Sequence, residues 1–256
     1  MTKTLHPMQQ SDGLPGGPLS WPSEGVLVLI ALLLPTVMTW LYFVQFAGQS
    51  GWMIGLYTVG KLTMVGIALL PLVMVRRETG HWPHFPLRSC RGMGWGLFFG
   101  AITVGTMIWL YHTQLKGSPA LERAPAAVGQ KLREIGITTD WHFLGMAVFL
   151  SVLHAAFEEY YWRWFVFGQL RRGLPWGAAL VVASVGFTLH HVIVIYIYVP
   201  SWPWTLLFSL GVGIGGGVWA WIYQKSGSLA GPWVSHMLID FGLMWIGYDL
   251  CQGMWT

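Results

Sequence analysis

Two adjacent carboxylates and an arginine stand inside a long apolar stretch, where residues 158–163 read Glu-Glu-Tyr-Tyr-Trp-Arg. Ionised side chains in a hydrocarbon-length helix are costly unless they are paired, neutralised or near water. Glu159 and Arg163 are four residues apart and share one helix face, with the acid N-terminal to the base. Glu158 points about 100° away around the helix axis. The spacing therefore predicts one carboxylate tied to Arg163 and a second, Glu158, that is free to do chemistry.

Further ionisable residues lie inside apolar stretches elsewhere in the chain. They are His154 in the same stretch, His190 and His191 in a second, and His236 and Asp240 in a third. His154 precedes Glu158 by four residues, and His236 precedes Asp240 by four, so each pair shares a helix face. Taken singly, His154 and His190 are interpreted as packing residues. Taken together, inward polar faces on three helices predict one convergent site, because exposure to lipid would be prohibitive.

The depth of these residues is the difficulty for such a site. Counting about 1.5 Å per residue from the cytoplasmic ends places Glu158 roughly 20 Å deep and His236 nearer 12 Å, with His191 deepest. Straight helices would therefore keep them apart. Tilted or interrupted helices would bring them together, and Gly186 and Pro175 are places where this could happen.

The residues form three ordered motifs that resemble those of the CPBP intramembrane proteases. This family is also called the CAAX amino-terminal protease or Abi family and includes the type II CAAX prenyl endopeptidases. EExxxR matches residues 158–163, FxxxH matches Phe187–His191, and His236–Asp240 matches a histidine followed four residues later by Asn or Asp. Asp240 occupies a position where the family often has Asn. The resemblance covers about residues 140 to 245.

The resemblance implies an intramembrane endopeptidase in which Glu158, as general base, activates a water together with His191. His236 and Asp240 would stabilise the oxyanion, with Asp240 either protonated or holding His236 as an imidazolium. The supporting residues would be Glu159, Arg163 and Phe187. No cofactor is required in this mechanism. A divalent metal is the alternative, and its ligands would be Glu158, His191 and His236.

The composition requires a membrane protein. Of 256 residues, 54% are hydrophobic and only 9% are charged, whereas a soluble domain is roughly one quarter charged. Seven apolar stretches are long enough to cross a bilayer. They are Gly25–Gly48, Trp52–Val75, Gly92–Leu115, Trp141–Leu170, Pro175–Val199, Trp204–Tyr223 and Leu229–Leu250. The predicted fold is an all-α, CAAX-protease-like bundle: a loose cytoplasmic tail over residues 1–24, then a single transmembrane domain over 25–256.

Most of the Lys and Arg residues between the stretches lie on the same side of the membrane as the N-terminus. By the positive-inside rule, this predicts a cytoplasmic N-terminus and an external C-terminus. The long connection from Lys116 to Asp140 then lies outside. Val128, Leu132 and Ile135 follow helical spacing there and predict a short interfacial helix. The patterns Gly96-xxx-Gly100 and Gly213-xxx-Gly217 predict close contacts between helices. Lys61, in the second stretch, is expected to pair with a carboxylate or to snorkel.

Three functions remain open on the sequence. The first is the endopeptidase, acting on a membrane-associated peptide or protein in the lipid bilayer, with the bacterial inner membrane as the expected location. In the eukaryotic branch of the family the substrate is a prenylated C-terminal tail. The second is a non-catalytic scaffold or accessory subunit of a larger membrane complex. The third is a protein whose histidines ligate a cofactor or pigment. The net charge of +4 is small and does not suggest a nucleic-acid partner.

Overall fold

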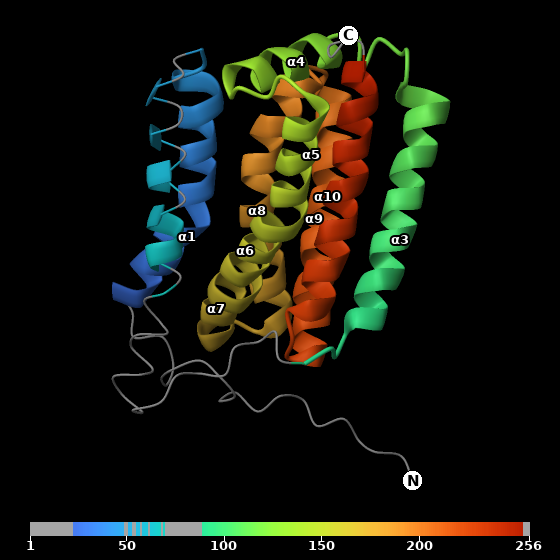
Figure 1. Ribbon diagram of the computed structural model, residues 1–256. Coiled ribbons are helices and arrows are strands. Elements are labelled where there is room, and N and C mark those ends of the chain that lie inside the picture. The colour runs from blue at the N-terminus through green and yellow to red at the C-terminus, as the bar shows by residue number, and fades with distance from the viewer. Residues whose placement is uncertain are drawn as a thin grey trace.

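The computed structural model describes residues 23–48 and 89–252, together with 51–52, 55–56, 58–60, 62–67 and 69. Every regular element in these residues is a helix, which confirms the predicted all-α membrane fold (Figure 1). Among the described residues, five helical spans are long and apolar enough to cross a membrane. They are Gly25–Gln45, Met93–Leu115, Asp140–Gly173, Trp176–Tyr198 and Trp202–Ser226.

These spans coincide with the first, third, fourth, fifth and sixth of the predicted stretches. The seventh forms α10 (Ala230–Cys251), which has 22 residues, carries Asp240 and Asp249, and is not among the five. Part of the second stretch, Trp52–Val75, lies outside the described residues, including Lys61 and residues 70–75, as do residues 1–22.

The span Asp140–Gly173, which corresponds to the fourth predicted stretch, is called the fourth span below. It is a continuous helix of 34 residues that runs obliquely across the bundle (Figure 1). It consists of α5 (Asp140–Val148), η3 (Phe149–His154), α6 (Ala155–Glu159), η4 (Tyr160–Phe167) and α7 (Gly168–Gly173). The segments η3 and η4 are π-helical. Such wide turns inside α-helices are rare and are frequent at functional sites. The short segment α6, which carries both adjacent acids, thus lies between two π-helical segments.

The segment η4 forms the centre of the hydrophobic core. Every residue from Tyr161 to Phe167 is buried. They pack against α1 (Ser23–Trp40), α8 (Trp176–Tyr198) and α9 (Trp202–Ser226). Protein rather than lipid therefore surrounds this part of the fourth span, and a buried arginine is tolerated there because neighbouring helices can supply its partners.

Close packing of α3 (Met93–Leu110) against α10 holds the last helix in place. A Cβ atom at Gly96 would overlap the carbonyl group of Gly231, and one at Gly100 would lie 3.2 Å from the Cα of Ser235. The pattern Gly96-xxx-Gly100 therefore marks a real helix–helix contact, as its spacing predicts.

The C-terminal end of α10 is fixed to the C-terminal end of the span that begins with α3. Asp249 Oδ2 accepts hydrogen bonds from Tyr111 Oη at 2.5 Å and from Lys116 Nζ at 2.6 Å. Tyr111 is the first residue of η2 (Tyr111–Leu115), the π-helical continuation of α3. The helix that carries His236 and Asp240 is thus held near both of its ends.

The connection between the third and fourth spans contains the predicted interfacial helix, α4 (Ala124–Glu134). Leu132 is buried and Val128 packs against the same cluster. Ile135, which follows the same spacing, comes one residue after the helix and is 38% exposed. The apolar face is therefore shorter than the sequence suggests.

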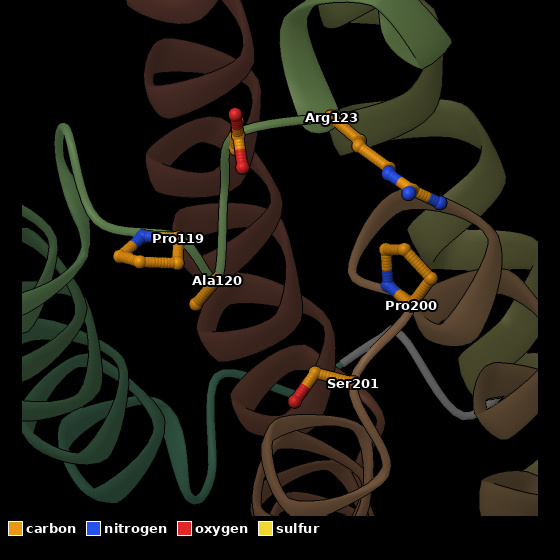
Figure 2. A pocket seen from close by; sticks show the side chains of 6 residues that line it. Pro119, Ala120, Arg123, Pro200 and Ser201 are labelled. Carbon is orange, nitrogen blue, oxygen red and sulfur yellow. The ribbon is translucent and has the colours of Figure 1, made fainter.

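A pocket of about 280 Å³ lies between this connection and the turn that joins α8 to α9. In Figure 2 the Arg123 side chain reaches over Pro200, while Pro119 and Ala120 lie on the loop segment on the opposite side of the pocket. The lining residues are Pro119, Ala120, Glu122, Arg123, Pro200 and Ser201. None of them belongs to the three motifs.

Basic residues lie at both ends of the bundle. The helices α4 and α7 lie at opposite ends (Figure 1). The basic pair Arg171–Arg172 of α7 and the connection over residues 116–140 are therefore separated by the length of the bundle, as the distribution of Lys and Arg predicts. Which end faces the cytoplasm stays a prediction.

Candidate active site

The two adjacent acids of α6 are both buried, Glu158 being 5% and Glu159 0% exposed. Because neighbouring residues on a helix point about 100° apart, the two carboxylates leave α6 in different directions and meet different partners. Glu159 is fixed by charge pairing, and Glu158 faces a group of histidines.

One oxygen of Glu159 serves two partners. Arg163 Nη1 donates to Oε1 over 2.9 Å, and His236 Nδ1 lies 2.7 Å from the same atom. The pairing with Arg163 is the one that the four-residue spacing predicts. Since an ionised carboxylate can only accept, the Nδ1 atom of His236 carries the hydrogen. Glu159 thus joins the fourth span to α10.

Arg163 lies between aromatic rings of two other helices. Its Cζ atom is 4.5 Å from the centroid of the Phe187 ring on α8 and 4.8 Å from that of Trp219 on α9. A Cβ atom at Gly216 would lie 3.3 Å from Phe187 and 3.5 Å from the guanidinium. The glycines of α9 therefore allow it to approach Arg163 closely, which assigns Gly216 a place in the site.

Glu158 faces imidazoles from three segments. His154 Nε2 lies 3.2 Å and His190 Nε2 3.8 Å from Oε1. His236 Nε2 lies 3.9 Å from Oε2. His191 completes the group, because one ligand atom each of Glu158, His190 and His191 lies within 4.8 Å of the others. A buried carboxylate with several imidazoles around it is a candidate proton acceptor.

The two histidines of α8 are held in different ways. His191 Nδ1 lies 2.8 Å from the carbonyl oxygen of Phe187. Since a carbonyl can only accept, Nδ1 is the donor, and Nε2 of a neutral His191 is left able to accept. His190 stacks on Trp162, with ring centroids 5.8 Å apart and an interplanar angle of 7°.

The His236 ring is fixed on several sides. Trp219 stacks on it with centroids 4.4 Å apart at 14°, and Phe187 approaches edge-on at 6.1 Å and 89°. With Nδ1 bound to Glu159, the opposite nitrogen Nε2 faces Glu158 and lies 3.6 Å from Asp240 Oδ2. The plane and the tautomer of His236 are therefore both set by its neighbours.

The structure thus brings the predicted residues Glu158, His191, His236 and Asp240 to one place. Straight helices would keep Glu158 and His236 apart, but the fourth span runs obliquely, and Glu158 Oε2 lies 3.9 Å from His236 Nε2. Phe187 lies among them, as the FxxxH motif suggests.

Two histidines have a larger part in the site than the sequence indicates. The interpretation of His154 and His190 as packing residues is incomplete, since both reach Glu158. The four-residue spacing from His154 to Glu158 predicts the contact of His154, which the structure contains. Trp219 and Ser235 belong to no motif, and Trp219 reaches the site only through the packing of α9 against α10.

Glu158, His190 and His191 form a group that could hold a metal ion. Zinc takes nitrogen and oxygen ligands at about 2.0–2.2 Å, so three donors within 4.8 Å of one another approach what one ion requires. His236, which the sequence suggests as a ligand, is outside this group. Its Nδ1 is bound to Glu159 and its Nε2 also faces Asp240. In this group of possible ligands, His190 is found instead of His236.

Comparison with known proteins agrees with the motifs. The family model "Type II CAAX prenyl endopeptidase Rce1-like" matches residues 140–242, a segment that contains all three motifs. This bears out the suspected relation to the CPBP family. No curated protein and no solved structure matches the chain.

Proposed function

Because residues 140–242 form an Rce1-like domain, we propose that this multi-pass membrane protein is an intramembrane endopeptidase with Glu158 as its general base. The Rce1-like family is a family of membrane proteases. The observation that carries the residue assignment is the contrast between the two acids of α6. Glu159 is committed to Arg163 and His236, whereas Glu158 is buried among imidazoles.

The proposed reaction begins with a water held between Glu158 and His191 Nε2. Glu158 takes one proton from this water as the oxygen attacks the peptide carbonyl, so that an O–H bond breaks and a C–O bond forms. The tetrahedral intermediate then collapses. Glu158 gives its proton to the nitrogen of the leaving amine, the C–N bond breaks, and the carboxylate of Glu158 is restored.

His236 is the proposed oxyanion stabiliser. Its Nδ1–H is bound to Glu159, so a second hydrogen on Nε2 makes an imidazolium whose Nε2–H can donate to the oxyanion. Asp240 lies 3.6 Å from that nitrogen and would favour the charged ring. This arrangement accounts for Asp where the family often has Asn, because here Asp acts on His236 rather than on the oxyanion.

The proposed substrate is a membrane-associated peptide or protein. Water and substrate must meet at a site within the bundle, and helix packing around η4 keeps lipid away from the charged groups. From the distribution of Lys and Arg we also propose a cytoplasmic N-terminus, and the proposed location is the bacterial inner membrane.

A metal-dependent version of the same hydrolysis is the second candidate, favoured by the gathering of Glu158, His190 and His191. A bound zinc ion would supply Lewis acidity and a more acidic water. Elemental analysis of purified protein, with activity measured before and after chelation, separates the two versions. Retained activity in metal-free protein supports the glutamate-activated water, and its loss with recovery on adding zinc supports the metal.

The proposal is tested by comparing peptide ends in membranes of cells that produce the wild type, Glu158→Gln or Glu122→Gln. Glu122 is an exposed carboxylate on the loop before α4 and serves as the matched control. New peptide ends should appear with the wild type and the control and be missing with Glu158→Gln. Identical peptide ends in all three samples would favour the non-catalytic scaffold.

A further inference from the structure

The helix α9 carries none of the three motifs, yet it supplies one wall of the site. Trp219 is only 4% exposed and lies with its ring nearly parallel to that of His236, at 4.4 Å and 14°. Its indole Nε1 donates a hydrogen bond to Ser235 Oγ over 2.9 Å, and Ser235 immediately precedes His236 on α10. The indole is thereby fixed to the backbone segment whose imidazole it covers.

The contacts of Trp219 complement those of Glu159. Glu159 holds one nitrogen of His236, which fixes the ring at its edge but leaves rotation about that hydrogen bond. Stacking on Trp219 and the perpendicular Phe187 ring remove this rotation. The same indole lies 4.8 Å from Arg163 Cζ. Trp219 therefore contacts both partners of Glu159.

We propose that Trp219 is a positioning residue that sets the plane of the His236 ring, so that Nε2 faces Glu158 and the reacting carbonyl. The inference on catalysis rests on the proposed function, whereas the inference on ring orientation does not. In this proposal α9 takes part in the site through the aromatic face of Trp219 and its hydrogen bond to Ser235, without any ionisable group.

The kinetic test compares Trp219→Leu, Trp219→Phe, Ser235→Ala and Trp202→Leu in purified protein, with a quenched-fluorescence peptide built on a cleavage site found in membranes. Trp219→Leu removes the stacked ring, and we expect kcat to fall by about 10²-fold with KM unchanged, as misplacement of a reacting group by ~1 Å can do. Trp219→Phe keeps a ring and should recover most of kcat. Trp202, on the same helix and 57% exposed, is the control and should change nothing.

Ser235→Ala removes the acceptor of the indole hydrogen bond but leaves the ring in place. A smaller fall in kcat is expected than for Trp219→Leu. Thermal-shift measurements on each variant show whether the protein is folded at the assay temperature. Folded Trp219→Leu protein with wild-type kcat would overturn the proposal, as would a Trp219→Phe variant no better than Trp219→Leu.

An NMR measurement tests the ring orientation without any substrate. In protein with ¹⁵N-labelled histidine, the ¹⁵N signal of His236 Nε2, assigned by its loss in His236→Gln, reports whether that nitrogen is held toward Glu158 and Asp240. This signal should be kept in Trp219→Phe and in the control and be broadened or lost in Trp219→Leu. An unchanged signal in Trp219→Leu contradicts the positioning role even if the protein proves not to be a protease. Conversely, an active Glu158→Gln protein would sink the proposed function and leave the NMR result standing.

Discussion

At the scale of single residues, the adjacent acids of α6 differ in what they hold. Glu158→Gln keeps the side-chain shape and removes a buried charge, so we expect proteolysis to be abolished and the melting temperature to stay near that of the wild type. Glu159→Gln leaves Arg163 as a buried cation without its counter-ion. Breaking a buried pair from one side costs roughly 3–5 kcal/mol, so stability should fall together with activity. Thermal-shift measurements in detergent compare the two variants.

A double change separates charge pairing from other roles of Glu159. In Glu159→Gln with Arg163→Met no cation is left without a partner, so part of the lost melting temperature should return. Activity should stay low, because His236 loses its charged acceptor. Equal destabilisation by Glu158→Gln and Glu159→Gln, or no recovery in the double variant, would contradict this division between the acids.

Asp240 provides a second test at this scale. If it acts by supporting the charged form of His236, Asp240→Asn should lower kcat by about 10-fold, since an amide still offers an oxygen to Nε2 but carries no charge. Asp240→Leu should be far less active at similar melting temperature. An Asp240→Asn enzyme faster than the wild type would instead indicate that the side chain donates to the oxyanion.

At the scale of elements, the contact between α3 and α10 positions His236 through the backbone. Gly96→Ala would drive a methyl group into the carbonyl of Gly231. Because this neighbour is backbone and cannot rotate away, we expect destabilisation of about 1–3 kcal/mol and a fall in activity. Gly105→Ala on the same helix meets open space and is the control. Its stability should be unchanged or slightly higher, as alanine favours helix.

The sequence could predict those parts of the site that depend on one helix at a time. The four-residue spacings from Glu159 to Arg163 and from His236 to Asp240 fix a shared face whatever the bundle does, and both pairs meet in the structure. Contacts between helices are different. The approach of His190 to Glu158 depends on the tilt and the π-helical turns of the fourth span, and neither leaves a periodic pattern.

At the scale of the whole molecule, the orientation in the membrane can be tested with a native residue. Cys90 is exposed and precedes α3, at the end of the bundle opposite α4, whereas Cys251 is buried (Figure 1). In a Cys251→Ser background, an impermeant thiol reagent should label Cys90 only from the cytoplasmic side. In a Cys90→Ser, Cys251→Ser background, Ala126→Cys in α4 should react only from the outside. Labelling of both from one side would overturn the predicted topology.

The single oxygen shared by Arg163 and His236 has a consequence for chimeric proteins. Glu159 Oε1 is a joint between the fourth span and α10, and the aromatic rings around it come from α8 and α9. Transplanting residues 140–173 alone into a related bundle would carry the acid without the imidazole that it orients. A functional exchange therefore has to move four helices as one block: the fourth span, α8, α9 and α10.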